Sequence, residues 1–186
     1  LYTSAYRVVD ENLNFQYNQN FTYKHRLGEA LIMINTMGCT QVFSKELLEQ
    51  AIKRSNIEES NSINMPNHDG WMYLTAITLN SNIYHDSNPH INYRQHGNNV
   101  VGAFAASFKN RFKRIVANKN IKSRISKILL YTFDNLDAES EQLLALNATY
   151  QNSIKSKSKL IFSKEMMTNS ISVNLAYRIL IIFNLF

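Results

Sequence analysis

The side chains that could do chemistry in this sequence lie close together, in residues 67–102. They include a carboxylate, a guanidinium, an indole and two imidazoles: His68, Asp69, Trp71, Arg94 and His96. A carboxylate can act as a general base, an imidazole as a metal ligand, and a guanidinium beside a Gly-containing turn as an anion-binding group. Each of these residue types is common, so their closeness in the sequence does not by itself identify a reaction.

The segment that carries Asp69 is predicted to be a helix. Trp71, Leu74 and Ile77 fall on one helical face, and Asp69 lies in the first turn, where a carboxylate interacts favourably with the helix dipole. A solvated acid at a helix start is the structural alternative to a catalytic base. After this helix, residues 83–84 and 91–93 form short β-like runs around an Asp-Ser-Asn-Pro turn, which predicts a hairpin or a bent strand pair that ends at Arg94.

The residues that precede this helix are predicted to alternate between strands and helices. Residues 1–6 indicate a strand, 27–31 a short helix, and 45–53 a helix that Ser44 caps. Residues 32–43 form a β-rich run that Gly38 interrupts, either as a bulge or as a place where a ligand approaches the backbone. We interpret Cys39 as a small packed side chain.

The C-terminal part of the chain is predicted to be helical and basic. Residues 1–100 carry seven Lys and Arg against nine Asp and Glu, a net of −2, whereas residues 101–186 carry thirteen against five, a net of +8. Aromatic residues at helical spacing in 101–133 predict a basic helix pair, residues 137–150 a further helix, and 154–159 a Lys- and Ser-rich connector before an apolar end. The surplus of positive charge favours an anionic partner for this half of the chain. Two arrangements remain open: the aromatic residues pack on the first half and the lysines are solvated, or this half lies on a membrane surface.

Composition limits the class of protein. A hydrophobic content of 45% supports a packed core, and a single cysteine excludes an intrachain disulfide. No secretory leader and no apolar run of about 20 residues is present in the sequence, which disfavours a signal peptide and a spanning helix. His25, His85, His90 and Asp86 lie in turn-like settings, where we expect surface or capping roles.

Two strings in the site region resemble a known family. HDGWMYL at 68–74 and NIYHDSNPHINYRQHGNNVVG at 82–102 are similar to the second half of family 2 glycosyltransferases of the GT-A fold, in particular the bacterial rhamnosyltransferase-like enzymes of surface polysaccharide synthesis. YRQHGNN at 93–99 is the most specific part. Residues 2–11 and 38–48 also resemble segments of that family, so the resemblance is dense over 1–102 and loose beyond.

The resemblance implies a fold and a division of the chain. We expect an α/β fold, in which residues 1–102 form the acceptor-side, C-terminal part of a GT-A mixed-sheet domain. Residues 103–186 are then a basic helical extension.

The resemblance also implies an inverting transfer of a sugar from a nucleotide-sugar donor to a hydroxyl of a sugar or lipid-linked saccharide acceptor. Asp69 would be the general base, and His96 would complete the coordination of Mg²⁺ or Mn²⁺. Either Arg94 or the backbone of the turn at residues 97–99 would contact the diphosphate. The remaining substrate-binding residues of this interpretation, which would shape the acceptor pocket, are Gly38, Cys39, Thr40, His68 and Trp71.

The sequence departs from the family pattern in one respect. No Asp-x-Asp motif precedes Asp69, so we expect the acidic motif and the nucleotide-binding half upstream of Leu1, and little binding of nucleotide-sugar by this chain alone. The alternative function is a non-enzymatic binding module whose basic helices contact an anionic membrane or nucleic acid. Nucleic acid is disfavoured because the basic segment has no recognition-helix or stacking-aromatic pattern. We expect a cytoplasmic protein, with a peripheral position on the inner face of the plasma membrane left open.

Overall fold

The computed structural model describes residues 1–20, 24–32, 37–55, 67–95, 121–134, 136–168 and 171–186. The first part mixes strands and helices: β1 (Tyr2–Ser4), β2 (Tyr6–Val9), β3 (Phe15–Gln19), α1 (Leu27–Ile32), the 3₁₀ turn η1 (Gly38–Thr40), α2 (Lys45–Ser55), α4 (His68–Thr78), β4 (Tyr84–Asp86) and β5 (Asn92–Arg94). The described elements of the second part are helical: α6 (Ile121–Thr132), α7 (Ala138–Thr149), the 3₁₀ turn η2 (Tyr150–Asn152), α8 (Ile154–Phe162) and α9 (Ile171–Ile182). The predicted fold class, a mixed α/β part followed by a helical part, is confirmed.

The strands form two small sheets from the same two stretches of chain. β1 pairs in parallel with β4, and β2 lies between β3, which is antiparallel to it, and β5, which is parallel to it. Residues 84–94 therefore run alongside residues 2–9, and between the two sheets the Ala5 amide donates to the Asp86 carbonyl at 2.8 Å. The predicted pairing of residues 83–84 with 91–93, as a hairpin or a bent strand pair, is wrong, because β4 pairs with β1 and β5 pairs with β2.

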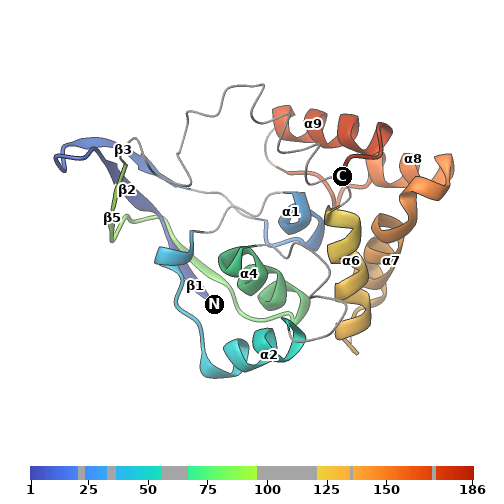
Figure 1. Cartoon of the computed structure of the whole chain (residues 1–186), viewed down its shortest axis with the longest axis horizontal. Helices are drawn as coiled ribbons and strands as arrows, with labels where there is room; N and C mark the ends of the chain where they lie inside the picture. The colour runs from blue at the N-terminus through green and yellow to red at the C-terminus, as the bar shows by residue number, and fades with distance from the viewer. Residues whose placement is uncertain (21–23, 33–36, 56–66, 96–120, 135, 169–170) are drawn as a thin grey trace.

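The helices pack away from the three-stranded sheet. Figure 1 shows β2, β3 and β5 projecting to one side, with α6, α7 and α8 on the other side and α1 and α4 between them. Residues of α1, α2, α4 and α6–α9 contribute to one apolar cluster, in which Leu31, Leu74, Leu129 and Leu144 are fully buried. The cluster thus includes residues on both sides of the predicted domain boundary near residue 102. That boundary lies outside the described residues, and the division into two domains stays a prediction.

Local capping signals identify the two best-predicted helices. The Ser44 hydroxyl accepts from the Leu47 amide at 3.2 Å before α2, and the Asp137 carboxylate accepts from the Ser140 amide at 2.9 Å before α7. Both side chains satisfy amide groups that have no partner within the helix. The predicted N-termini of these two helices are confirmed.

Two other segments differ from the sequence prediction. The expected connector at 154–159 is the first part of α8, because Leu160 is fully buried and gives the segment a core-facing side that outweighs its polar composition. The expected strand around Gly38 is the 3₁₀ turn η1, and only Val42 beyond it forms an isolated bridge with Tyr2.

Of the basic helix pair predicted for residues 101–133, the structure describes only the second helix, α6. Residues 101–120 lie outside the described residues, whereas α6 buries Ile125, Ile128 and Leu129 in the core. Asn147 on α7 donates to the Ser126 hydroxyl on α6 at 2.7 Å. Within the described ranges, no helix is long and apolar enough to cross a membrane.

Candidate functional site

The start of α4 lies against the 3₁₀ turn η1. Asp69, in the first turn of α4, is half-buried and His68 is exposed. The Gln41 side chain donates to the Asp69 backbone carbonyl at 2.9 Å, which ties the segment that follows η1 to the helix. The Asp69 carboxylate itself accepts from the Gly70 amide at 2.9 Å. The structure therefore holds Asp69 by its backbone and its side chain together.

Gly38 is the residue of η1 that comes closest to α4. A Cβ atom placed on Gly38 would lie 2.6 Å from His68 Nε2 and 3.4 Å from Asp69 Cβ. The φ angle of Gly38 is not positive, so a larger side chain here would conflict with the present position of the His68 ring and not with the backbone conformation. The interpretation of Gly38 as a bulge is wrong, because the close approach is made by the His68 ring.

Thr40 anchors η1 to the first strand. Its side chain is buried, lies 2.9 Å from the Thr3 hydroxyl across β1, and donates to the Met37 carbonyl at 2.9 Å. The Thr40 hydroxyl thus faces the interior of the protein. In this position it orients the turn that carries Gly38 and Cys39.

Cys39 is exposed, so its interpretation as a packed side chain is wrong. Nearby atoms still remove part of its solvation, and this raises the pKa of the thiol; the negative charge of Asp69 raises it further. The pKa of Tyr6 on β2 rises to about 12, mainly through burial, and Cys39 contributes to that rise. A thiol of raised pKa stays protonated and is a poor nucleophile. Cys39 therefore lines the Asp69 surface as a neutral group.

Trp71 and Arg94, two other predicted site residues, lie in different surroundings from Asp69. Trp71 is buried in the core, and its indole nitrogen donates to the Ala51 carbonyl on α2 at 3.0 Å. It fixes α4 on α2. Arg94 is exposed at the end of β5, an edge strand, in register with Val9. His96, the predicted metal ligand, lies outside the described residues.

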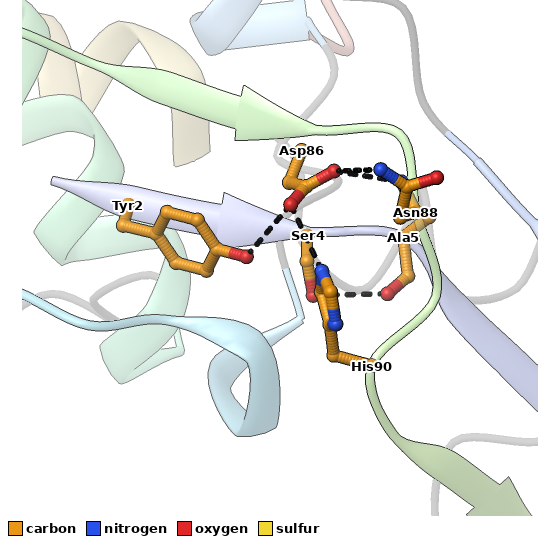
Figure 2. A network of polar contacts seen from close by, with 6 residues as sticks. All are labelled: Tyr2, Ser4, Ala5, Asp86, Asn88 and His90. Atoms are coloured by element: carbon orange, nitrogen blue, oxygen red, sulfur yellow. Dashed lines mark hydrogen bonds and ion pairs between the residues drawn. The ribbon is translucent and has the colours of Figure 1, made fainter.

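The Asp86 carboxylate has several polar partners around the loop between β4 and β5. Figure 2 shows its carboxylate between Tyr2, Asn88 and His90, with distances of 3.3 Å to the Tyr2 hydroxyl and 2.9 Å to His90 Nε2. The Asn88 amide, at 2.8 Å, is the strongest of the contacts that lower the pKa of Asp86 to about 2. The interpretation of Asp86 as a turn residue is confirmed by its contacts with Asn88, and His90 is exposed, as expected of a surface or capping group.

Gln41 and Thr3 are the structural supports that the sequence did not indicate. Each bonds a partner far along the chain, and neither belongs to a local motif. In the part of the chain that the structure describes, no three His, Cys, Asp or Glu side chains come together to hold a metal ion.

Comparisons with known proteins give one partial similarity. Over 94 residues, 49% of its length, the chain is 40% identical to a dTDP-rhamnosyl transferase of Shigella flexneri, RfbG. The chain spans 32% of the length of that relative. No protein-family model and no solved structure matches it.

Proposed function

We propose that this chain is the acceptor-side part of a glycosyltransferase that moves rhamnose from a dTDP-linked donor to a hydroxyl of a saccharide, in the synthesis of cell-surface polysaccharide. The observation that carries the proposal is the 40% identity to a dTDP-rhamnosyl transferase over half of this chain. The exposed surface around Asp69 supports it, because it presents a carboxylate, an imidazole and a glycine turn on one side of α4.

Asp69 is the general base of this proposal. The acceptor oxygen attacks the anomeric carbon of the donor and forms the new glycosidic bond, while its proton passes to the Asp69 carboxylate. The bond between the anomeric carbon and the diphosphate oxygen breaks, and the electron pair leaves with dTDP. A single displacement of this kind inverts the anomeric configuration. A half-buried carboxylate is suited to that role when the Gly70 amide donates to it and Gln41 holds the backbone carbonyl of the same residue.

His68 and Cys39 form the exposed border of the acceptor surface. His68 reaches Gly38, and only a glycine there leaves room for the imidazole in this position. The imidazole can donate to or accept from a sugar hydroxyl. Trp71 contributes indirectly, since its indole fixes α4 on α2.

The last part of this proposal concerns where the donor nucleotide and the cation bind. The 94 matched residues are 32% of the length of the relative, and residues 1–186 contain no Asp-x-Asp motif. We assign donor binding and the acidic cation ligands to another part of the complete protein. His96 lies outside the described residues, and its role as a ligand of Mg²⁺ or Mn²⁺ remains a prediction.

A donor assay on the complete protein tests the proposal. We expect release of dTDP from dTDP-rhamnose in the presence of a saccharide acceptor, and a product of inverted anomeric configuration. Turnover of a different nucleotide-sugar would overturn the rhamnosyl assignment, and no turnover of any nucleotide-sugar would overturn the glycosyltransferase. In calorimetry with dTDP and Mn²⁺, we expect no micromolar binding by the 186-residue chain alone.

A further inference from the structure

The exposed face of α9 consists almost entirely of apolar residues. Its exposed positions, together with the residue that follows the helix, are Ile171, Ser172, Leu175, Ala176, Ile179, Ile182 and Phe183. At about 100° per residue these positions cover an arc of about 140° on the helix surface. Ile171 is 88% exposed and Phe183 is 66% exposed. We call these seven residues the α9 face.

The opposite side of α9 is well packed, so the α9 face is a defined surface. Tyr177 and Ile181 are buried, and the Tyr177 hydroxyl donates to the Leu160 carbonyl of α8 at 3.1 Å. At the start of the helix, the Asn174 side chain bonds both the backbone and the hydroxyl of Thr168. The helix is thereby fixed on both α8 and the preceding loop, with its apolar arc turned outward.

The chain segment that carries the α9 face is positively charged. Residues 154–186 contain five basic residues, Lys155, Lys157, Lys159, Lys164 and Arg178, and one acid, Glu165, which gives a net of +4. Glu165 forms an ion pair with Arg26 at 3.7 Å, so its charge is already matched. The Lys157 ammonium donates to the Ile182 carbonyl at 3.2 Å, at the end of the α9 face. Arg178 borders the same arc, next to the angular positions of Ile171 and Ile182.

We propose that the α9 face binds the surface of an anionic lipid bilayer. With 12 residues, α9 is about 18 Å long, whereas the hydrocarbon core is about 30 Å thick, so the helix lies in the plane of the interface. Its isoleucine, leucine and phenylalanine side chains enter the boundary between headgroups and acyl chains. The lysines of α8 and Arg178 then interact with the lipid phosphates.

The charge distribution favours lipid over a second copy of this chain. A symmetric dimer through the α9 face would bring together two copies of segment 154–186, each of net charge +4, and like charges in proximity oppose association. An anionic bilayer neutralises that charge. The inference depends on α8 and α9 alone and does not require the proposed transferase activity.

Co-sedimentation of the chain with vesicles tests the inference. Phosphatidylglycerol mixed into phosphatidylcholine supplies the anionic surface, and phosphatidylcholine alone is the neutral comparison. We expect binding to the mixed vesicles that weakens as salt is added, and little binding to the neutral ones. Leu175→Glu places a charge in the centre of the α9 face and should lower the partition coefficient at least about tenfold.

Phe15→Glu is the matched control. Phe15 is 58% exposed and Leu175 is 59% exposed, and both changes introduce the same charge. Phe15 lies on β3, in the sheet that projects away from the helices (Figure 1). Its substitution should leave vesicle binding unchanged apart from the effect of one added negative charge on the whole chain. Lys155→Glu and Lys159→Glu should weaken binding to the anionic vesicles and reduce its dependence on salt.

Three results would overturn the inference. The first is no co-sedimentation of the unmodified chain with anionic vesicles at low salt. The second is equal loss of binding in Leu175→Glu and Phe15→Glu. The third, measured by light scattering, is a dimer that Leu175→Glu dissociates while vesicle binding is absent, which would assign the α9 face to a second copy.

Discussion

Replacing Gly28 with alanine should destabilise the protein through one steric contact. Gly28 lies in the first turn of α1, and a Cβ atom there would be 2.4 Å from the Glu165 carbonyl oxygen and 2.6 Å from the Met166 sulfur. Favourable contacts between heavy atoms are about 3.5 Å or longer, so α1 and the loop between α8 and α9 must separate by roughly 1 Å. The obstacle is a backbone atom, which cannot rotate away as a side chain can.

Two terms of opposite sign set the size of the effect. Adding a methyl group to a closely packed site costs about 1–3 kcal/mol. Alanine is favoured over glycine in a helix by up to about 1 kcal/mol, and less in a terminal turn. The free energy of unfolding should therefore fall by about 1–2 kcal/mol in Gly28→Ala.

Gly38→Ala is the control for this prediction. Its Cβ atom would meet the His68 ring at 2.6 Å, which is a similar overlap, but the His68 side chain is exposed and can turn away. We expect a change within about 0.5 kcal/mol. Urea denaturation followed by circular dichroism measures both variants. Equal stability of Gly28→Ala and the unmodified protein, or an equal loss in both variants, would refute the packing of α1 against residues 165–166.

Three further substitutions test single contacts. Trp71→Phe removes the hydrogen bond to Ala51 and should lower the free energy of unfolding by about 1–2 kcal/mol in urea denaturation, with an unchanged value counting against that contact. Asp137→Ala removes the cap of α7 and should cost about 1 kcal/mol, whereas Asp137→Asn should retain most of the stability. Asp86 has a pKa lowered from 3.8 to about 2, so its contribution is present above pH 3.8 and is lost as the pH falls towards 2. Asp86→Asn should therefore flatten the dependence of the urea midpoint on pH in that window, and an unaltered slope would contradict the network in Figure 2.

The elements that could be predicted are those whose signals are local. Ser44 and Asp137 cap helices three residues away, and apolar spacing identified α4 together with the place of Asp69 in its first turn. The partners of β4 and β5 could not be predicted in this way. Tyr84 pairs with Tyr2 across more than eighty residues, and no short-range pattern specifies such a register.

The candidate site was predictable in its residue types but not in its contacts. The resemblance to glycosyltransferases grouped Gly38 and Cys39 with Asp69, and the structure does place the Gly38 turn against His68 and Asp69. Their roles in binding stay a prediction. Gln41 was missed because its partner lies 28 residues further on, and the exposure of Cys39 depends on how η1 turns.

The most direct test of the proposed function is Asp69→Asn in the complete protein. The amide keeps the size of the carboxylate and cannot accept the proton of the acceptor hydroxyl. We predict that kcat for rhamnose transfer falls by about 10²–10⁴-fold, while the Kd for the dTDP-linked donor stays within about twofold. Asp86→Asn, the same change in a carboxylate outside the site, should retain kcat at neutral pH. Transfer by Asp69→Asn at the rate of the unmodified enzyme would contradict the assignment of Asp69 as the general base.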